Sequence, residues 1–440
     1  MRIKVIKTKL KCFIKKINLK TIIEYLFYFF VFVFLWQTKL IIVPGDSNYN
    51  EIALFGNYIL LSVILILFFV YKVKNKRESG AAPGIDKYLV ILAALDFFIF
   101  LSILISSNIG LSIFRYILFL LSVGLMYLML NFKFNFKKII LVFLAALLLQ
   151  AGLGIGQFFT QETFACKYLG IASHEASDLG TSVIETGNER FLRAYGATDH
   201  PNIFGALMFF AIFFTILLMV KNNYHGTKAT IAYLSLFLYF IALCLSFSRS
   251  AILSLAISLL FLFLVFFFTD KKLFHKFLPI FLSLVLLSGA LFLLLKPLIL
   301  VRVDASSRLE KISLNERQEQ NIVASHIILD NMWLGVGLGN YHNELLNEQS
   351  NLKTYEAQPV HNVFLLMWAE IGLWGLLFFL YFVLYLFKIN IKKLYYIPLF
   401  IGLLIFMLLD HWLWSLSGSY LFLFFILSLT FYFKDDNLSS

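Results

Sequence analysis

The chain has 440 residues, of which 60% are hydrophobic and 14% are charged, a balance that excludes a soluble globular protein. The formal net charge of +12 does not indicate nucleic-acid binding, because the basic residues gather in short loops beside apolar runs, where they meet anionic lipid. The apolar runs reach about 17 to 22 residues, which lets a helix cross roughly 30 Å of hydrocarbon. Their apolarity is continuous rather than alternating, so helices are expected and barrel strands are not.

The apolar runs predict an all-α polytopic membrane protein with about twelve transmembrane helices. In chain order the expected spans are 22–43, 52–71, 88–106, 109–130, 139–160, 201–220, 229–247, 250–269, 277–296, 361–387, 394–412 and 418–433. Lys and Arg concentrate in the tails and in the loops on the same side, so the positive-inside rule places both termini in the cytoplasm. The whole chain, residues 1–440, is expected to form one integral membrane domain.

Two long polar segments interrupt the pattern of short connections, at residues 161–200 and 298–360. Both fall on the extracytoplasmic side, and loops of this length are usually functional or disordered. In the second loop, Ser313-Leu-Asn-Glu316 fits a capping box. This motif predicts the start of an amphipathic helix that carries Arg317 and lies on the membrane surface.

Three glycines at alternate positions, Gly335, Gly337 and Gly339, are predicted to end that helix in a turn. The run does not indicate a dinucleotide site, because its last spacing differs from GxGxxG and no strand precedes it. A turn that lets the backbone approach a ligand is the expected role, so Gly337 and Gly339 are candidate substrate-binding residues.

Arg249 lies in Ser246-Phe-Ser-Arg-Ser250, between two spans joined by almost no loop. An arginine at a helix end is often only a residue that reaches toward the interface. Span counting puts this one on the outer side, however, where the positive-inside rule disfavours cations. Because guanidinium binds phosphate oxygens in a bidentate manner, Arg249 is a candidate pyrophosphate ligand.

His361 follows Pro359 at the expected start of a span, with Asn362 beside it and Glu370 further along. The order Arg317, Gly337, Gly339, His361, Asn362 resembles the signature of the O-antigen ligase and Wzy-type polymerase superfamily. The resemblance is best over residues 190–380, and a looser part of it is the stretch from Arg193 to His200, Pro201 and Asn202.

This resemblance implies a glycosyltransferase on the outer face of the cytoplasmic membrane that uses a polyprenyl-diphosphate-linked glycan as donor. The acceptor would be a glycan, lipid or polymer hydroxyl, with inversion at the anomeric carbon. His361, Arg317 and Arg249 would be catalytic, because imidazole accepts a proton near pH 7 and arginines hold the diphosphate without a metal ion. Arg193, Asn362, Glu370, Gly337, Gly339 and His200 would bind substrate. No cofactor is expected.

A metal site is not predicted, although Asp199, His200, His342 and His361 together offer ligand atoms, because their spacing matches no zinc pattern. Two acidic residues, Asp96 and Asp410, fall in or near expected spans. Such carboxylates would couple protons in a transporter and would brace cationic neighbours in a transferase.

Two alternatives remain open. A Wzy-type polymerase shares the chemistry and differs in its acceptor, a second lipid-linked glycan, and nothing in the sequence separates it from a ligase. A polysaccharide flippase also has about twelve spans, but it would spread charged residues through the bundle rather than gather polar residues on one face.

Overall fold

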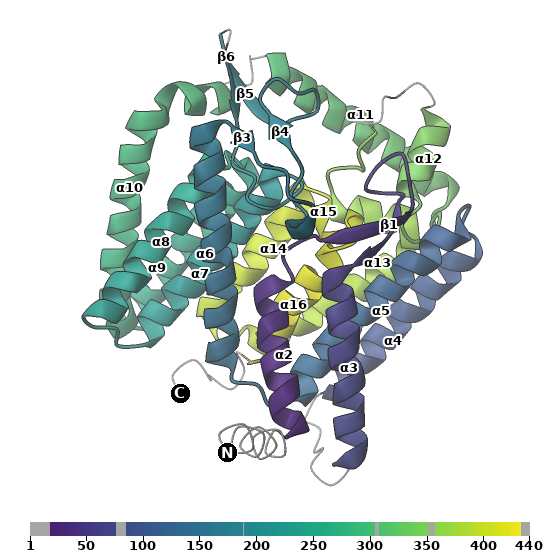
Figure 1. Cartoon of the computed structure of the whole chain (residues 1–440), viewed down its shortest axis with the longest axis horizontal. Helices are drawn as coiled ribbons and strands as arrows, with labels where there is room; N and C mark the ends of the chain where they lie inside the picture. Colours follow the sequence, from purple (N-terminus) through teal and green to yellow (C-terminus); the bar gives the residue numbers. More distant parts are fainter. Residues whose placement is uncertain are drawn as a thin grey trace, which may run out of the picture.

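The computed structural model describes residues 18–75, 85–187, 189–303, 308–349, 352 and 357–432. Helices form most of this part of the chain and lie side by side as a bundle, with three two-stranded sheets at one end (Figure 1). The helices are α2 (Leu19–Val33), α3 (Gly56–Lys74), α4 (Ile85–Leu104), α5 (Ile109–Asn131), α6 (Phe136–Thr160), α7 (Pro201–Lys221), α8 (Thr227–Leu245), α9 (Arg249–Thr269), α10 (Lys271–Val303), α11 (Arg308–Asp330), α12 (Tyr341–Glu348), α13 (Val363–Asn390), α14 (Ile397–Leu409), α15 (Trp412–Ser415) and α16 (Ser419–Tyr432).

Within the described residues, nine helices are long and apolar enough to cross a membrane by length and composition, namely α3 to α10 and α13. Helices α2, α14 and α16 occupy the other three expected spans with 15, 13 and 14 residues. A full crossing needs about 20 residues. These observations support a multi-pass helical membrane protein, and the number of twelve spans remains a prediction.

The end of the first expected span is wrong. Helix α2 ends at Val33, and β1 (Lys39–Val43) then pairs antiparallel with β2 (Ile52–Phe55), which occupies the expected start of the second span. The run Leu40-Ile-Ile-Val43 is as apolar as a helix span but rich in β-branched side chains, which favour a strand. The fold is therefore not purely α-helical. The other two hairpins, β3 (Glu162–Thr163) with β4 (His174–Glu175) and β5 (Val183–Thr186) with β6 (Glu189–Leu192), lie in the 161–200 segment.

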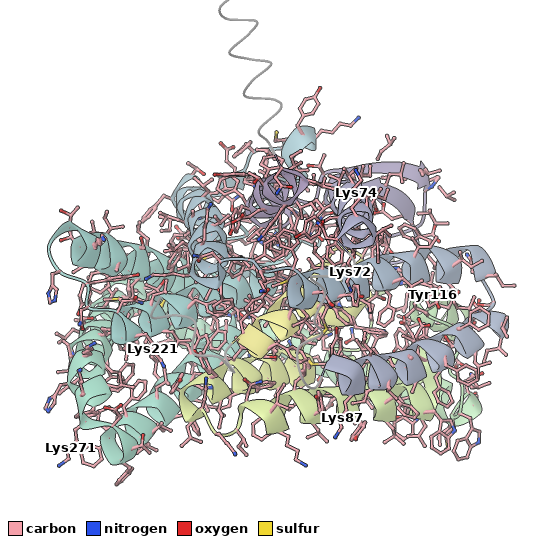
Figure 2. The ribbon with its side chains drawn as sticks, turned by 90° about the horizontal axis from the view of Figure 1, so that it is seen from below. Lys72, Lys74, Lys87, Tyr116, Lys221 and Lys271 are labelled. Atoms are coloured by element: carbon pink, nitrogen blue, oxygen red, sulfur yellow. The ribbon has the colours of Figure 1, made fainter. Side chains whose placement is uncertain are left out.

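Lysines gather at the end of the bundle opposite the sheets. The ammonium groups of Lys72, Lys137 and Lys276 donate to Asn131, Asn222 and Asn223 at 3.2, 3.0 and 2.7 Å, which joins the ends of α3, α5, α6, α7 and α10. Figure 2 views the molecule from this side, with Lys72, Lys74 and Lys221 labelled. The placement of this end in the cytoplasm by the positive-inside rule remains a prediction.

Helix α7 is the centre of the bundle. Its 18-residue membrane window is entirely buried, whereas the corresponding windows of α8 and α9 are 33% buried. An almost wholly apolar sequence permits this, and its Thr215 hydroxyl donates back to Ala211 O at 2.7 Å. The helix begins at Pro201 after the capping residue His200. The first turn of the most buried helix is therefore fixed at the end of the bundle that carries the sheets.

The segment expected as a loop from 298 to 360 is largely helical. Helix α10 bends at Leu295, two residues before Pro297, and continues to Val303. The prediction of a helix start at Ser313 is wrong, because α11 already includes Arg308 and runs to Asp330. Good helix-forming residues before Ser313 extend the helix past the local capping signal.

The apolar side of α11 rests on protein. Its buried residues, Ala324, Ile327 and Ile328, all lie in its second half, and α11 packs on α13. Of the apolar residues on that half of the helix, Ile322 and Leu329 remain exposed, at 58% and 65%.

The glycine turn after α11 is confirmed, and its partner is α13. Val336 N donates to Ala369 O at 2.8 Å and Gly337 N to Glu370 O at 3.0 Å, while Leu373 N donates to Met332 O at 2.9 Å. Helix α13 breaks at this point because Gly372 adopts φ 71° and ψ 177°. The backbone of the turn thus supplies hydrogen-bond partners to the broken helix.

We predict that Gly372→Ala destabilises the protein strongly. A Cβ at this position would lie 2.1 Å from Trp333 O, and its positive φ adds strain of about 1–3 kcal/mol for a residue other than glycine. Thermal unfolding of the purified protein in detergent tests this. The matched control is Gly289→Ala, where a Cβ meets nothing within 4 Å; equal melting temperatures for the two variants would contradict the role given to the break.

Candidate active site

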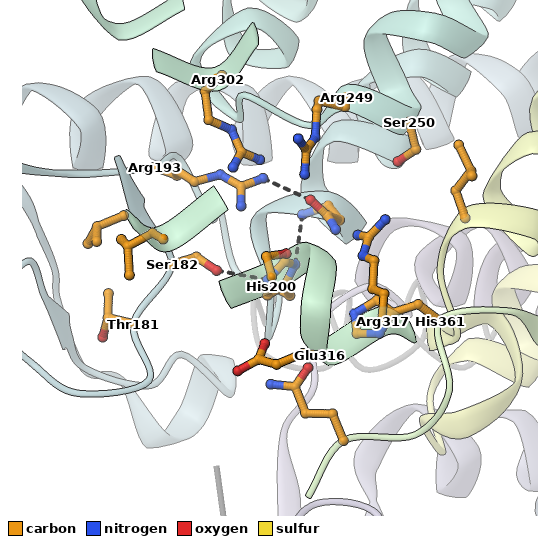
Figure 3. A pocket seen from close by; sticks show the side chains of 16 residues that line it. Thr181, Ser182, Arg193, His200, Arg249, Ser250, Arg302, Glu316, Arg317 and His361 are labelled. Atoms are coloured by element: carbon orange, nitrogen blue, oxygen red, sulfur yellow. Dashed lines mark hydrogen bonds between the residues drawn. The ribbon is translucent and has the colours of Figure 1, made fainter. Parts of the chain in front are cut away.

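Four arginines line one cavity of about 230 Å³ at the end of the bundle that carries the sheets (Figure 3). They come from four elements that are distant in sequence: the segment after β6, the start of α9, the end of α10 and the first half of α11. The full lining is Thr181, Ser182, Val183, Arg193, His200, Asn202, Arg249, Ser250, Arg302, Leu309, Ser313, Glu316, Arg317, Gln358, His361 and Leu409. The structure thus brings together five residues predicted from sequence, Arg193, His200, Arg249, Arg317 and His361.

The connection between α8 and α9 accepts hydrogen bonds from two of the arginines and is followed directly by a third. Arg193 Nε donates to Ser246 O at 2.8 Å, and Arg302 Nη2 donates to Phe247 O at 3.3 Å. Arg249 is the first residue of α9, whose cap Ser248 accepts from Ala251 N at 3.3 Å. Phe247 has φ 47°, a conformation that costs free energy in a residue other than glycine and is concentrated at functional sites.

A hydrogen-bonded chain links Arg193 to the other side of the cavity. Arg193 Nη2 donates to Asn202 Oδ1 at 2.8 Å, and Asn202 Nδ2 donates to Asp410 Oδ2 at 2.8 Å. Asp410 follows the end of α14 and is 5% exposed. The prediction that this acid braces a cationic neighbour in a transferase fits these contacts, with Asn202 as the intermediate.

Both ring nitrogens of His200 form hydrogen bonds within the protein. Its Nδ1 accepts from Asn202 N at 3.1 Å as the cap of α7, so Nε2 carries the proton and faces Ser182 Oγ at 2.8 Å. Burial lowers the pKa of His200, and the charge of Arg193 lowers it further. This histidine is therefore neutral at pH 7 and already fully hydrogen-bonded, which suits it to positioning rather than to proton transfer.

His361 stands at the border between α11 and α13. Its Nδ1 lies 2.7 Å from Gln320 Oε1, and because an amide oxygen only accepts, Nδ1 carries the proton and Nε2 has the lone pair. Burial lowers the pKa of His361, as do His411 and Arg317, while Asp410 raises it. The imidazole is therefore neutral at pH 7 and carries its lone pair on Nε2.

Asn362, Glu370, Gly337 and Gly339 are placed away from this cavity. Asn362 caps α13, where its Oδ1 accepts from Phe364 N and Leu365 N at 2.9 and 3.1 Å. Glu370 is 4% exposed and accepts from Trp414 Nε1 at 2.9 Å. Each of these positions fits a structural role, and their part in substrate binding remains a prediction.

A second, much smaller polar cavity surrounds Glu370. It has a volume of about 10 Å³ and is lined by Tyr49, Arg115, Gly339, Tyr341, His342, Pro359, Glu370, Trp414, Ser415 and Tyr420. Arg115 is 1% exposed, and its Nη2 donates to Tyr49 O at 2.7 Å. This space suits about one water molecule rather than a substrate.

Sequence reasoning missed Arg302, Gln320 and His411. Gln320 follows Arg317 by three residues, which places both on one face of α11, so helical spacing was an available signal. Arg302 is a second arginine on the side where cations are disfavoured, the argument that singled out Arg249. No pattern in the sequence pointed to His411, whose place depends on α14 ending at Leu409.

The residues considered as a metal set from sequence do not gather as a group. Instead His361, Asp410 and His411 each bring one ligand atom within 4.8 Å of the others, in the described part of the chain. The rings of His361 and His411 meet edge to face, with centroids 4.9 Å apart. The absence of a catalytic metal remains a prediction.

Comparison with known families finds a match over part of the chain. Residues 234–380 match the family model described as O-Antigen ligase, a stretch that includes Arg249, Arg302, Arg317 and His361. No curated protein matches the chain. Members of this family are glycosyltransferase-like ligases and polymerases, and lipid-linked glycans are the substrates that the family implies. Residues 234–380 are therefore similar to the O-antigen ligase family, which supports the resemblance to the O-antigen ligase and Wzy-type polymerase superfamily seen in the sequence.

Proposed function

We propose that this protein transfers a glycan from a polyprenyl-diphosphate carrier to an acceptor hydroxyl on the outer face of the cytoplasmic membrane. The observation that carries the proposal is the cavity in which Arg193, Arg249, Arg302 and Arg317 surround the same space as His361. A diphosphate is a compact polyanion, and guanidinium groups bind its oxygens in pairs. A cavity of about 230 Å³ at a bundle end lets the charged head group enter while its hydrocarbon chain stays in the membrane.

The arginines would act mainly on the leaving group. As the bond between the anomeric carbon and the diphosphate oxygen breaks, the diphosphate takes the electron pair and its negative charge grows. Positive groups fixed before the reaction stabilise that charge without reorganising, and they do so most strongly where water is scarce. Arg249 adds the free N–H groups at the start of α9, which also favour an anion.

His361 would act on the acceptor. Its Nε2 takes the proton from the acceptor hydroxyl, whose oxygen then attacks the anomeric carbon from the side opposite the diphosphate and inverts it. Gln320 holds Nδ1–H at 2.7 Å and so keeps the lone pair on Nε2. Because Arg317 and Gln320 share a face of α11, one helix would serve both the leaving group and the base.

A ligase and a polymerase need the same cavity, so the acceptor is the open part of the proposal. A flippase is less well supported, because within the described residues the cavity gathers its four arginines at one end of the bundle. Transport across the bundle would require polar groups along α7, and the membrane window of that helix is entirely buried and apolar.

For the orientation, we predict that cysteines at Tyr168 and Leu179 react with an impermeant maleimide in intact cells, in a chain whose native cysteines are replaced by serine. Both positions are strongly exposed, at 86% and 82%, in the 161–200 segment. Val73, 67% exposed at the lysine-bearing end of α3, is the control and should react only after permeabilisation. The reverse pattern would put the cavity in the cytoplasm and exclude transfer on the outer face.

For the leaving group, we predict that Arg249→Ala or Arg317→Ala lowers kcat by about 10²–10³, the usual effect of removing one preorganised electrostatic donor. Lysine should restore little, because it lacks the planar fork. The assay is transfer from purified lipid-linked donor. Arg308→Ala is the matched control, since Arg308 is 69% exposed and pairs with Glu185 at the rim. Near-normal rates in both pocket variants would refute the diphosphate role.

For the base, we predict that His361→Ala lowers turnover by about 10²–10⁴ while donor affinity changes little. His361→Gln keeps a hydrogen bond to the acceptor but cannot take its proton, so it should be nearly as slow. His326→Ala, at an exposed histidine of the same helix that carries Gln320, is the control. Full activity in the Gln variant would mean that His361 only positions the acceptor, and lost donor binding in the Ala variant would assign it to the diphosphate.

A further inference from the structure

Three potential ligand residues meet at the edge of the arginine cavity. His361, Asp410 and His411 each offer one ligand atom, and these atoms lie within 4.8 Å of one another. Asp410 and His411 are buried, at 5% and 6% exposed, while His361 also lines the cavity. The cluster is thus closed on the protein side and reachable from the cavity.

The surroundings fix the orientation of all three groups. Nδ1 of His361 is hydrogen-bonded to Gln320 Oε1 and Nδ1 of His411 to Ser415 Oγ, both at 2.7 Å. This leaves Nε2 of each ring for coordination. Asp410 accepts from Asn202 Nδ2 and from His411 N, each at 2.8 Å. Metal-binding histidines and carboxylates are held by outer hydrogen bonds of this kind, which orient the ligand atoms in advance.

From these contacts we propose that His361, Asp410 and His411 bind a divalent transition-metal ion such as Zn²⁺, and that the bound ion switches transfer off. Two imidazoles and one carboxylate suit Zn²⁺ or Co²⁺, whereas Mg²⁺ and Ca²⁺ prefer oxygen ligands. Three protein ligands leave a fourth position for water on the cavity side.

Inhibition of transfer by the bound ion follows from the two uses of His361 Nε2. The lone pair on His361 Nε2 either coordinates the ion or accepts the proton of the acceptor hydroxyl, and it cannot do both. This half of the inference rests on the proposed function of His361. The binding half does not, because it depends only on the geometry of the three ligands.

The experiment uses the full chain in detergent and Co²⁺ as a spectroscopic probe. Wild-type protein should bind one equivalent of Co²⁺ with the visible d–d absorption of a low-coordinate site, and Zn²⁺ should displace it. Zn²⁺ should also inhibit transfer from lipid-linked donor, and a chelator should reverse the inhibition. In His411→Gln, transfer without metal should persist while Co²⁺ affinity and Zn²⁺ sensitivity both fall by more than about 100-fold.

A second variant covers the case in which His411→Gln does not fold. Ser415→Ala removes only the hydrogen bond to His411 Nδ1 and should weaken Co²⁺ binding and Zn²⁺ inhibition by about 10–100-fold. Cys166→Ser is the control for Zn²⁺ captured by a thiol, since Cys166 is free and partly exposed; it should bind and be inhibited as wild type does.

The outcomes separate this inference from the proposed function. Absence of Co²⁺ binding, or equal affinity in wild type and His411→Gln, would overturn the metal site and leave the transferase proposal intact. A chelated protein that is inactive until Zn²⁺ is added would overturn the inhibitory role, and with it the assignment of His361 as a metal-free base. Normal Co²⁺ binding in a protein that transfers no glycan would support the site and refute the proposed reaction.

Discussion

Repulsion between like charges is the constraint on which the rest of this structure depends. Two unit positive charges about 6 Å apart repel by roughly 3 kcal/mol at an effective dielectric constant of about 20, and four arginines share one cavity here. The fold offsets this cost with backbone carbonyls and buried polar side chains. Ser246 O and Phe247 O accept from Arg193 and Arg302, and Asp410 acts on Arg193 through Asn202. An anionic ligand would relieve what repulsion remains, so the cavity is arranged to favour a polyanion.

The central helix makes these contacts durable. Because α7 is buried along its membrane window, its first turn cannot shift without disturbing the whole bundle. That turn carries Asn202, which contacts both Arg193 and Asp410, and its cap is His200. The positions of Arg193, His200 and Asn202 in the cavity therefore depend on α7, whose membrane window is entirely buried. A strained residue, Phe247, is tolerated beside it for the same reason.

The opposite wall depends on the pairing of the glycine turn with the break in α13. Hydrogen bonds at Val336, Gly337 and Leu373 tie the two together. This pairing fixes α11 against α13, and α11 brings Arg317 and Gln320 to His361. A single helix thus connects the arginine side of the cavity with the orientation of the imidazole. The same arrangement explains why Gly337 looked like a ligand-binding residue in sequence and packs against protein in the structure.

The sequence by itself determined the helical membrane class of the protein and five of the six arginines and histidines that line the cavity. Continuous apolar runs can only be helices in lipid, and an arginine on the outer side of a span stands out because its position is costly. The motif from Arg317 to His361 carried the family resemblance. Local signals were less dependable where the same residues suit two structures. The Leu40–Val43 run was expected in a membrane helix and forms a strand, and Ser313 was expected to start a helix and lies inside one.

Only the tertiary structure decided which of these residues meet. Arg193 and Asp410 are more than 200 positions apart, and their link through Asn202 depends on how α7 and α14 pack. His411 has no sequence pattern of its own, because it gains His361 and Ser415 as neighbours only where α14 stops. Glu370 was expected at the site and instead bonds to Trp414 beside a separate small cavity. The sequence shows which charged side chains lie at unfavourable positions beside a membrane span. Contacts between distant segments depend on packing, which no local pattern encodes.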